Sequence, residues 1–279
     1  MQERSGGHAL ATVAVPAYNC ASTILAALDS IEESIAYLKA LRGRNALVEI
    51  LVVDDGSTDA TPDLIASFAA TRPHVRLLRQ ANKGPGAARN AGAEAGTAPV
   101  LMYLDGDDLF FPSHIAVCLD LLDAHPEAGF AKTGVRLDES VHPGWKIGIS
   151  NSIVINCAVR RSVHEFIGGF FEEAPFKALH AEDALYSGLL MTFFTQVHSD
   201  LETVHHLVYP GNAFDRQRTK FSAPPQDAIE AMTEKEKEAE PEVMRIYEER
   251  RQSLARRAQN SDWSGPPINR EGPRLIAAD

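Results

Sequence analysis

The 279-residue chain is 44% hydrophobic and 23% charged, which leaves room for one large α/β domain with an appendage or for two small domains. Its net charge of −11 argues against nucleic acid or an anionic membrane surface as a partner, because the field around the protein repels both. The three cysteines are widely spaced among apolar residues, so we expect buried thiols in a reducing, cytoplasmic compartment rather than disulfides or a zinc site. No apolar run suits a transmembrane helix and residues 1–7 lack the apolar core of a signal peptide, although a peripheral membrane contact stays open.

The first predicted element is a strand, Ala9–Val15, which is rich in apolar and β-branched residues and stops at Pro16-Ala17-Tyr18-Asn19. Ser22 can cap the helix that follows, in which apolar residues recur at helical spacing from Ile24 to Leu38. One face of this helix is therefore expected to pack on a sheet.

The second strand repeats this arrangement and ends in acidic residues. Val48–Val53 runs into Asp54-Asp55-Gly56-Ser57-Thr58-Asp59, and Thr61-Pro62 opens another helix. A short strand at Val75–Leu78 and a helix around Ala87–Gly96 come next. Strands that alternate with helices predict a mostly parallel sheet flanked by helices, and such sheets bind ligands beyond the carboxyl ends of their strands.

The fourth predicted strand, Val100–Leu104, is a continuous apolar run that ends in Asp105-Gly106-Asp107-Asp108. If strand alternation continues past Leu104, Asp105 and Asp107 project to the same side, and Gly106 lets another group approach the backbone. Two carboxylates fixed side by side repel each other unless a cation lies between them, and Mg²⁺ or Mn²⁺ prefers such oxygen ligands. The same residues also suit an ordinary turn, so both interpretations stay open.

The central part of the chain has a less regular pattern. We expect a helix after Pro112, strands at Gly129–Leu137 and Ser152–Val159, a short helix at His164–Phe171, a loop at Ala174–Leu179, and a last strand at Val197–Tyr209 before a Pro210-Gly211-Asn212 turn. Glu182 and Asp183 lie at the start of a further helix that continues to Phe194. Acids are favourable in the first turn of any helix, so these two have a structural explanation as well as a functional one.

The composition shifts near residues 222–225. From Gln226 to Ala258 the chain is strongly charged and helix-forming, and Gly265–Asp279 has the composition of a disordered tail. We therefore divide the chain into a main domain, residues 1–221, with halves at about 9–110 and 111–221, and a charged helical extension with its tail, residues 222–279. The extension helix could pair with a second copy of the chain.

Six short motifs occur in order between Thr12 and Asn212: Pro16-Ala17-Tyr18-Asn19, Val53–Asp59, Gly84–Asn90, Asp105–Asp108, Gly168-Gly169-Phe170 and Glu182-Asp183. Together they resemble the family 2 inverting glycosyltransferases, whose nucleotide-sugar-binding fold is of the GT-A type. The resemblance implies that the main domain is a GT-A domain. It also implies an enzyme that transfers a sugar from a nucleoside diphosphate sugar, with a UDP-sugar as the favoured donor, to a saccharide or other hydroxyl acceptor.

The resemblance implies roles for individual residues. The nucleotide-sugar would contact Pro16, Tyr18, Asn19, Asp54, Asp55, Arg89, Asp105 and Gly106. Asp107, assisted by Asp105, would hold Mn²⁺ or Mg²⁺, and Asp183, beside Glu182, would be the catalytic base. Electrostatics agrees with these roles, because a departing diphosphate needs nearby positive charge in a protein that is itself negative.

Several residues depart from the family pattern or stay ambiguous. The family often has an arginine and a histidine where this chain has Leu207 and Tyr209, so we weigh His205 and His206 as substitutes against surface or packing roles. His180, beside the acid pair, is a candidate contact to the acceptor or to the metal. Trp145 suits either stacking on an acceptor sugar or packing. A solvated lysine is favoured for Lys83, and turn or cap roles are favoured for Asp59 and Asp108.

Three alternatives to a glycosyltransferase stay open. A phosphatase of the haloacid dehalogenase type would also use an Asp-x-Asp pair after an apolar strand, but it expects Thr or Val at Leu109 and the pair on its first strand. A nucleotidyltransferase would want a basic, glycine-rich loop where Cys20-Ala21-Ser22 stands. A non-catalytic relative would bind a sugar nucleotide or act as a scaffold through the helix after Gln226.

Overall fold

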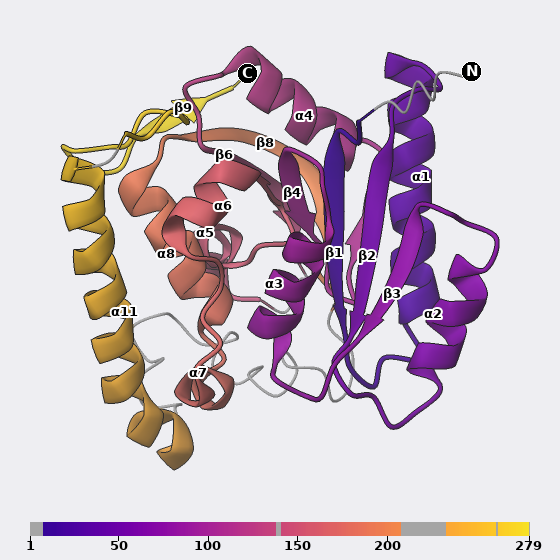
Figure 1. Cartoon of the computed structure of the whole chain (residues 1–279), viewed down its shortest axis with the longest axis horizontal. Coiled ribbons are helices and arrows are strands. Elements are labelled where there is room, and N and C mark those ends of the chain that lie inside the picture. Colours follow the sequence, from indigo (N-terminus) through magenta and orange to yellow (C-terminus); the bar gives the residue numbers. More distant parts are fainter. Residues whose placement is uncertain (1–7, 138–140, 208–232, 261, 279) are drawn as a thin grey trace.

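A computed structural model describes residues 8–137, 141–207, 233–260 and 262–278 (Figure 1). Its strands are β1 (Ala11–Ala17), β2 (Val48–Asp54), β3 (Val75–Arg79), β4 (Val100–Tyr103), β5 (Leu109–Phe110), β6 (Phe130–Arg136), β7 (Cys157–Arg160), β8 (Gln196–His205) and β9 (Leu275–Ala277). Its helices are α1 (Ile24–Arg42), α2 (Thr61–Ala69), α3 (Pro85–Ala95), α4 (His114–Ala124), α5 (Pro143–Ser152), α6 (Arg161–Ile167), α7 (Ala174–Leu179), α8 (Glu182–Phe193) and α11 (Glu234–Asn260).

All of the strands belong to one sheet with the order β3-β2-β1-β4-β7-β6-β8-β5, and β9 pairs with β8. Strands β3, β2, β1 and β4 are parallel, which confirms the predicted alternation of strands and helices. The strand β7 is antiparallel to both β4 and β6, whereas β6, β8 and β9 are parallel to one another. The carboxyl ends of β1, β2 and β4 therefore meet at one edge of the sheet.

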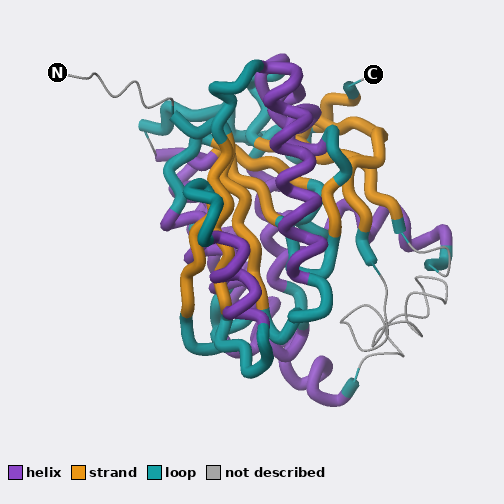
Figure 2. The backbone as a smooth tube through the Cα atoms, turned by 90° about the vertical axis from the view of Figure 1, so that its right-hand side faces the viewer, coloured by secondary structure: helices purple, strands orange, loops and turns teal. Residues whose placement is uncertain are grey.

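Helices cover both faces of the sheet, as Figure 2 shows in a view turned by 90°. On one face α1, α2 and α4 contribute side chains such as Ile31, Ile65 and Ile115 to a large apolar core. On the other face α3, α6, α8 and α11 form a second core rich in aromatic residues. The backbone of α3 lies especially close to β1, since a Cβ added at Gly92 would be 2.7 Å from the Cβ of Ala14. Because glycine leaves room for this close approach, α3 lies directly against β1.

Two segments of the central region differ from their predicted structure. Residues 174–179 form helix α7 instead of a loop, with a proline in the first turn and Phe176 buried. Helix α5 lies between the predicted strands Gly129–Leu137 and Ser152–Val159 and ends at Ser152, and β7 begins only at Cys157. The buried ammonium of Lys132 explains α5, because it donates to the carbonyl oxygens of Ser150, Asn151 and Ile153 near the helix end.

Helix α1 and strand β4 have ends that the sequence interpretation placed differently. The residue before α1 is Thr23, not Ser22, and its hydroxyl donates to the Gly106 carbonyl at 2.8 Å. Strand β4 ends at Tyr103, and the backbone N–H of Asp108 donates to the Asp105 carbonyl at 3.1 Å. The acidic residues therefore occupy a turn, so strand alternation does not apply to Asp105 and Asp107.

The C-terminal segment is ordered, in contrast to the predicted tail. The ring of Trp263 packs on Phe166 with centroids 5.0 Å apart, and the Asn269 backbone N–H donates to the Phe193 carbonyl at 2.7 Å. Strand β9 then pairs with β8. Tertiary contacts thus order a segment whose composition favours disorder. The predicted Pro210-Gly211-Asn212 turn and the boundary near residue 222 lie outside the described residues.

Candidate active site

The loops after β1 and β2 bind each other at the carboxyl edge of the sheet. Asn19 has a positive φ of 48°, and its side-chain oxygen accepts from the Thr58 backbone N–H at 2.8 Å. The Asn19 backbone N–H donates to the Ser57 hydroxyl at 3.0 Å. Tyr18 is 52% exposed, so its ring is available to a flat ligand. The Asn19 side chain therefore orders this rim, and Tyr18 offers its contact surface.

The two acids that end β2 organise the neighbouring loops. Asp54 is buried, accepts from the Ser57 backbone N–H and lies 3.2 Å from Arg79 Nε. Asp55 accepts from Gln80 Nε2 at 2.7 Å and from the backbone N–H groups of Lys83 and Gly84, each at 2.8 Å. These carboxylates fix the loop that leads into α3. Asp59 accepts from the Thr61 backbone N–H at the start of α2, which confirms its predicted turn role.

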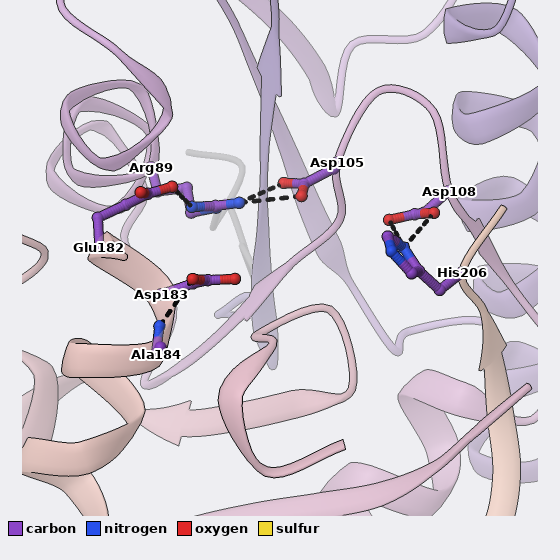
Figure 3. A network of polar contacts seen from close by, with 7 residues as sticks. All are labelled: Arg89, Asp105, Asp108, Glu182, Asp183, Ala184 and His206. Atoms are coloured by element: carbon purple, nitrogen blue, oxygen red, sulfur yellow. Dashed lines mark hydrogen bonds and ion pairs between the residues drawn. The ribbon is translucent and has the colours of Figure 1, made fainter. Parts of the chain in front are cut away.

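Arg89 of α3 joins two acidic segments that are far apart in the sequence (Figure 3). Its Nη2 donates to both carboxylate oxygens of Asp105, at 2.7 and 2.9 Å, and its Nη1 donates to Glu182 at 3.2 Å. The Arg89 side chain is 3% exposed. Burial alone would lower the pKa of Arg89, but the charges of Asp105, Glu182 and Asp183 raise it, so the guanidinium stays charged.

Asp183 lies in the first turn of α8, next to Glu182, and its carboxylate points into the same space as the Arg89–Asp105 pair (Figure 3). One carboxylate oxygen accepts from the Ala184 backbone N–H at 2.7 Å. Burial and the charge of Glu182 raise the pKa of Asp183 from 3.8 to about 7, against the opposing effect of Arg89. A carboxylate with this pKa can accept a proton effectively near neutral pH.

The buried Asp108 pairs with the partly buried His206 at the other end of the acidic turn (Figure 3). The Nδ1 of His206 lies 2.9 and 3.0 Å from the two Asp108 oxygens, and the Leu207 backbone N–H also donates to Asp108. Burial would lower the pKa of His206, but Asp108, Asp107 and Asp105 raise it to about 9. Asp108 therefore anchors the end of β8 to the turn, in agreement with the structural role predicted for it.

A buried layer of aromatic residues packs beneath the acidic turn and the start of α8. His164 Nδ1 lies 3.0 Å from the Tyr103 hydroxyl and 2.9 Å from the Tyr186 hydroxyl, which links β4 to α8. Burial lowers the pKa of His164 to about 4, so its ring is neutral at pH 7. Phe170 stacks on Tyr186 with centroids 3.9 Å apart. The strand that leads to Asp105 and the helix that begins at Glu182 are thus tied together by one polar network inside an apolar layer.

The family model described as glycosyl transferase family 2 matches residues 12–179. The chain belongs to this family. The match includes Arg89 and the acidic turn and ends just before Glu182, and it confirms the family predicted from the six motifs.

Curated relatives match part of this glycosyltransferase chain. The succinoglycan biosynthesis protein ExoO of Rhizobium meliloti (strain 1021) is 41% identical over 114 residues, which are 40% of this chain and 30% of ExoO. The chondroitin synthase of Escherichia coli is 33% identical over 111 residues, 40% of this chain and 15% of the synthase. The matched region thus spans less than a third of either relative.

Solved structures confirm the predicted GT-A fold. TarS of S. aureus, residues 1–349 in complex with UDP-GlcNAc, has a TM-score of 0.56 and 17% identity, with 91% of this chain and 68% of that chain covered. The mannosyltransferase PcManGT from Pyrobaculum calidifontis, in complex with GDP-Man and Mn²⁺, has a TM-score of 0.60 and 19% identity, with 92% and 77% covered. At these identities the likeness concerns the fold.

The acidic turn of this family 2 chain carries two carboxylates, and carboxylate oxygens are ligands that Mg²⁺ and Mn²⁺ prefer. Asp107 and Asp105 supply carboxylate oxygens, and an oxygen that accepts from Arg89 retains a second lone pair. No group of three His, Cys, Asp or Glu side chains suited to a metal is present among the described residues. The remaining ligands would therefore come from phosphate oxygens and water, as is usual for Mg²⁺.

Sequence reasoning missed the groups that hold the predicted residues in place. His164 and Tyr186 lie in helices that read as ordinary apolar segments, and no spacing rule connects them to Tyr103. The pairing of Arg89 with Glu182 joins residues 93 positions apart.

Trp145 packs with Val141 and Ile149 in a small apolar cluster of α5, and the exposed His180 ends α7 with a positive φ of 50°. Within residues 8–137, 141–207, 233–260 and 262–278, no helix is both long and apolar enough to cross a bilayer.

Proposed function

We propose that the chain is a metal-dependent inverting glycosyltransferase that moves a sugar from a nucleoside diphosphate sugar to an acceptor hydroxyl. The observation that carries the proposal is the position of Asp183 beside the Arg89–Asp105 pair, with a pKa raised to about 7. A base near the acidic turn can accept the acceptor proton while the donor diphosphate is held at that turn. The family and the GT-A fold support this reaction class.

Asp183 is the proposed general base. Its carboxylate takes the proton of an acceptor hydroxyl as that oxygen bonds to the anomeric carbon, and the bond from this carbon to the diphosphate oxygen breaks with its electron pair going to the diphosphate. A single displacement from the face opposite the leaving group inverts the configuration. Glu182 assists indirectly, because its negative charge raises the pKa of Asp183 while its own carboxylate is held by Arg89.

The donor is held by the loops at the carboxyl edge of the sheet. Tyr18 is exposed there, and Pro16, Asn19, Asp54 and Asp55 shape the adjoining loops. We propose that these residues receive the nucleoside, with a UDP-sugar as the favoured donor. Support for a nucleoside diphosphate sugar comes from the solved structures, since TarS is in complex with UDP-GlcNAc and PcManGT with GDP-Man and Mn²⁺.

Asp107 and Asp105 would hold the cation, and Gly106 lets the turn lie against neighbouring groups. A Cβ at Gly106 would be 2.9 Å from Cys20 Sγ and 3.3 Å from the Pro16 carbonyl oxygen, so glycine keeps this turn close to the loop after β1. A bound Mg²⁺ or Mn²⁺ would neutralise charge that develops on the departing diphosphate. Arg89 fixes the orientation of the Asp105 carboxylate toward this position.

A screen of nucleotide sugars tests the proposal. We expect slow hydrolysis of one nucleoside diphosphate sugar, dependent on Mn²⁺ or Mg²⁺, and a rise in Tm with the matching nucleotide only when the cation is present. A phosphatase would instead release phosphate from simple esters without nucleotide preference. A non-catalytic relative would show the Tm rise and no hydrolysis, while a scaffold would show neither, and each of these results would overturn the proposal.

A further inference from the structure

The segment Gly168–Glu173 lies between the Arg89 cluster and helix α11. On the side of α3, the Phe170 backbone N–H donates to Asn90 Oδ1 at 2.8 Å, and Asn90 Nδ2 donates back to the Phe170 carbonyl at 3.1 Å. On the side of α11, Arg250 Nη1 donates to the Gly169 carbonyl at 3.1 Å. Polar contacts therefore hold this segment from two opposite directions.

Phe170 is the residue of the segment that reaches the candidate active site. Its ring stacks on Tyr186 at an interplanar angle of 13°, and the guanidinium carbon of Arg89 lies 5.3 Å from its centroid. Because Arg89 is buried against this ring, a displaced Phe170 would also displace the group that orients Asp105 and Glu182.

The segment has little space in which to move toward α3. A Cβ added at Gly86 would lie 2.6 Å from the Phe171 carbonyl oxygen and 3.3 Å from Glu182 Cγ. The backbone at Phe171 thus packs directly against the first turn of α3. Movement of the segment away from α3 is opposed by its contacts with α11 on the other side.

Arg250 makes three different contacts with the segment. Besides its hydrogen bond to Gly169, its guanidinium carbon lies 3.6 Å from the centroid of the Phe171 ring, and its Nη2 is 3.5 Å from a Glu173 oxygen. Each contact uses a separate property of the guanidinium: its donors, its flat face and its charge. The side chain is 22% exposed, so these contacts are partly shielded from solvent.

Helix α11 is well anchored as a base for this contact. Its Val243 and Leu254 are buried in the aromatic-rich core, and Arg257 Nη1 donates to the Phe166 carbonyl at 3.1 Å. In Figure 1 the helix runs alongside α7 and α8, and a Cβ at Gly188 of α8 would be 3.1 Å from the Tyr247 hydroxyl. Charged residues on its other side pair within the helix, which explains the high charge of the extension.

We propose that Arg250 is a positioning residue for sugar transfer. Its guanidinium clamps Gly169, Phe171 and Glu173 so that Phe170 keeps Arg89, and through it Asp105 and Glu182, in the geometry needed for the reaction. Helix α11 of the extension therefore contributes to the geometry of the active site. This inference rests on the proposed function for its kinetic consequences, whereas the clamp itself can be tested without any reaction.

The kinetic test compares two arginines of the same helix. Arg245 is 54% exposed and pairs with Glu242 and Glu249 of α11, so Arg245→Ala makes the same change of charge away from the segment. For metal-dependent hydrolysis of the donor identified by the screen, we expect Arg250→Ala to lower kcat about tenfold and to leave KM within about twofold, because geometry is lost while the donor loops are unchanged. Equal effects of the two substitutions, or a rise in KM at unchanged kcat, would overturn the proposal.

Amide hydrogen exchange tests the clamp in the full chain without ligand. We expect peptides that cover residues 168–173 to exchange several-fold faster in Arg250→Ala and at the wild-type rate in Arg245→Ala. Unchanged exchange in Arg250→Ala refutes the clamp even if the enzyme is active. Faster exchange in a protein that hydrolyses no nucleotide sugar supports the clamp and refutes the proposed function. Should Arg250→Ala fail to fold, Arg250→Gln, which keeps a donor but loses the charge, is measured against the same expectations.

Discussion

Arg89 donates through one nitrogen to both carboxylate oxygens of Asp105 and lies almost wholly out of solvent. These charge-assisted contacts to both oxygens restrain the carboxylate in orientation as well as in position. Because the second terminal nitrogen of Arg89 reaches Glu182, one guanidinium sets the spatial relation between the acidic turn after β4 and the start of α8. The two halves of the proposed reaction therefore share a single buried support.

Replacement of Arg89 should cost considerable stability. Arg89→Ala leaves the carboxylates of Asp105 and Glu182 near each other without compensation, and breaking a buried ion pair in this way typically costs about 3–5 kcal/mol. We expect a loss of this order in the free energy of unfolding from urea denaturation. Arg79→Ala is the matched control, since Arg79 is 64% exposed and its ion pair is with Asp54. A loss no larger than that of the control would contradict the bridging role.

Asp183→Asn should abolish transfer while donor binding persists. Asn cannot accept the acceptor proton, yet its side-chain oxygen can still accept from the Ala184 backbone N–H, so the start of α8 is retained. We expect kcat to fall at least about a hundredfold, the lower end of what a general base contributes. Nucleotide binding, followed by the cation-dependent rise in Tm, should match the wild type. Transfer at the wild-type rate would place the base elsewhere.

The raised pKa of Asp183 predicts opposite pH trends for activity and stability. In the wild type, kcat/KM should fall as pH drops below about 7, because the proton acceptor of the free enzyme becomes occupied. A carboxyl whose folded pKa lies above its unfolded value contributes stability that is present below pH 4 and is lost as pH rises through about 7. Asp183→Asn should therefore have a Tm at least about 2 °C above the wild type at pH 8 and an equal Tm at pH 3.5. A lower Tm at pH 8 would show that the charged form is favoured in the fold.

Substitutions at two neighbouring residues of the acidic turn should have different effects, one on cation binding and the other on the stability of the fold. We expect Asp107→Ala to abolish the Tm rise that the nucleotide and Mn²⁺ produce together, because a ligand of the cation is lost. Asp108→Asn should instead lower the Tm of the unliganded protein, since Asp108 holds His206 and the Leu207 backbone. If Asp107→Ala retained the full cation-dependent shift, the proposed cation site would be wrong.

The Tyr103–His164–Tyr186 network predicts strong non-additivity. His164→Leu removes the partner that two buried tyrosine hydroxyls share and leaves them their long contact of 3.5 Å with each other. A buried polar group left unsatisfied costs about 1–3 kcal/mol. Combining His164→Leu with Tyr103→Phe and Tyr186→Phe removes those hydroxyls, so the triple variant should be more stable to urea than His164→Leu alone. Simple addition of the three single effects would contradict the network.

Several strong local patterns led to correct expectations. The apolar runs that become β1, β2 and β4 are buried on both faces, and their polar endings gather at one edge because parallel strands share a direction. The three thiols are buried and unpaired, as expected. Family likeness then assigned roles to residues such as Arg89, whose contacts with Asp105 and Glu182 no local pattern reveals.

Tertiary contacts decided the parts that sequence reasoning missed. Helix α5 contains glycines and β-branched residues, which are poor helix formers. Its end is stabilised by Lys132 of β6. The segment after Trp263 has the composition of a loop, yet aromatic packing and pairing with β8 order it. Such contacts join residues distant in the sequence, so a window of neighbouring residues carries no sign of them.

The order of strands in the sheet has a consequence for refolding. Strands β1 to β4 come from residues 11–103 and pair through helical crossovers, whereas β6 pairs with β8, and β8 with β9, both from residues 196–277. Pairings between distant residues form more slowly because a longer loop must close. After dilution from denaturant, recovery of helical circular dichroism should therefore run ahead of recovered catalysis, as the groups contributed by α8, β8 and α11 join a sheet that is already partly built.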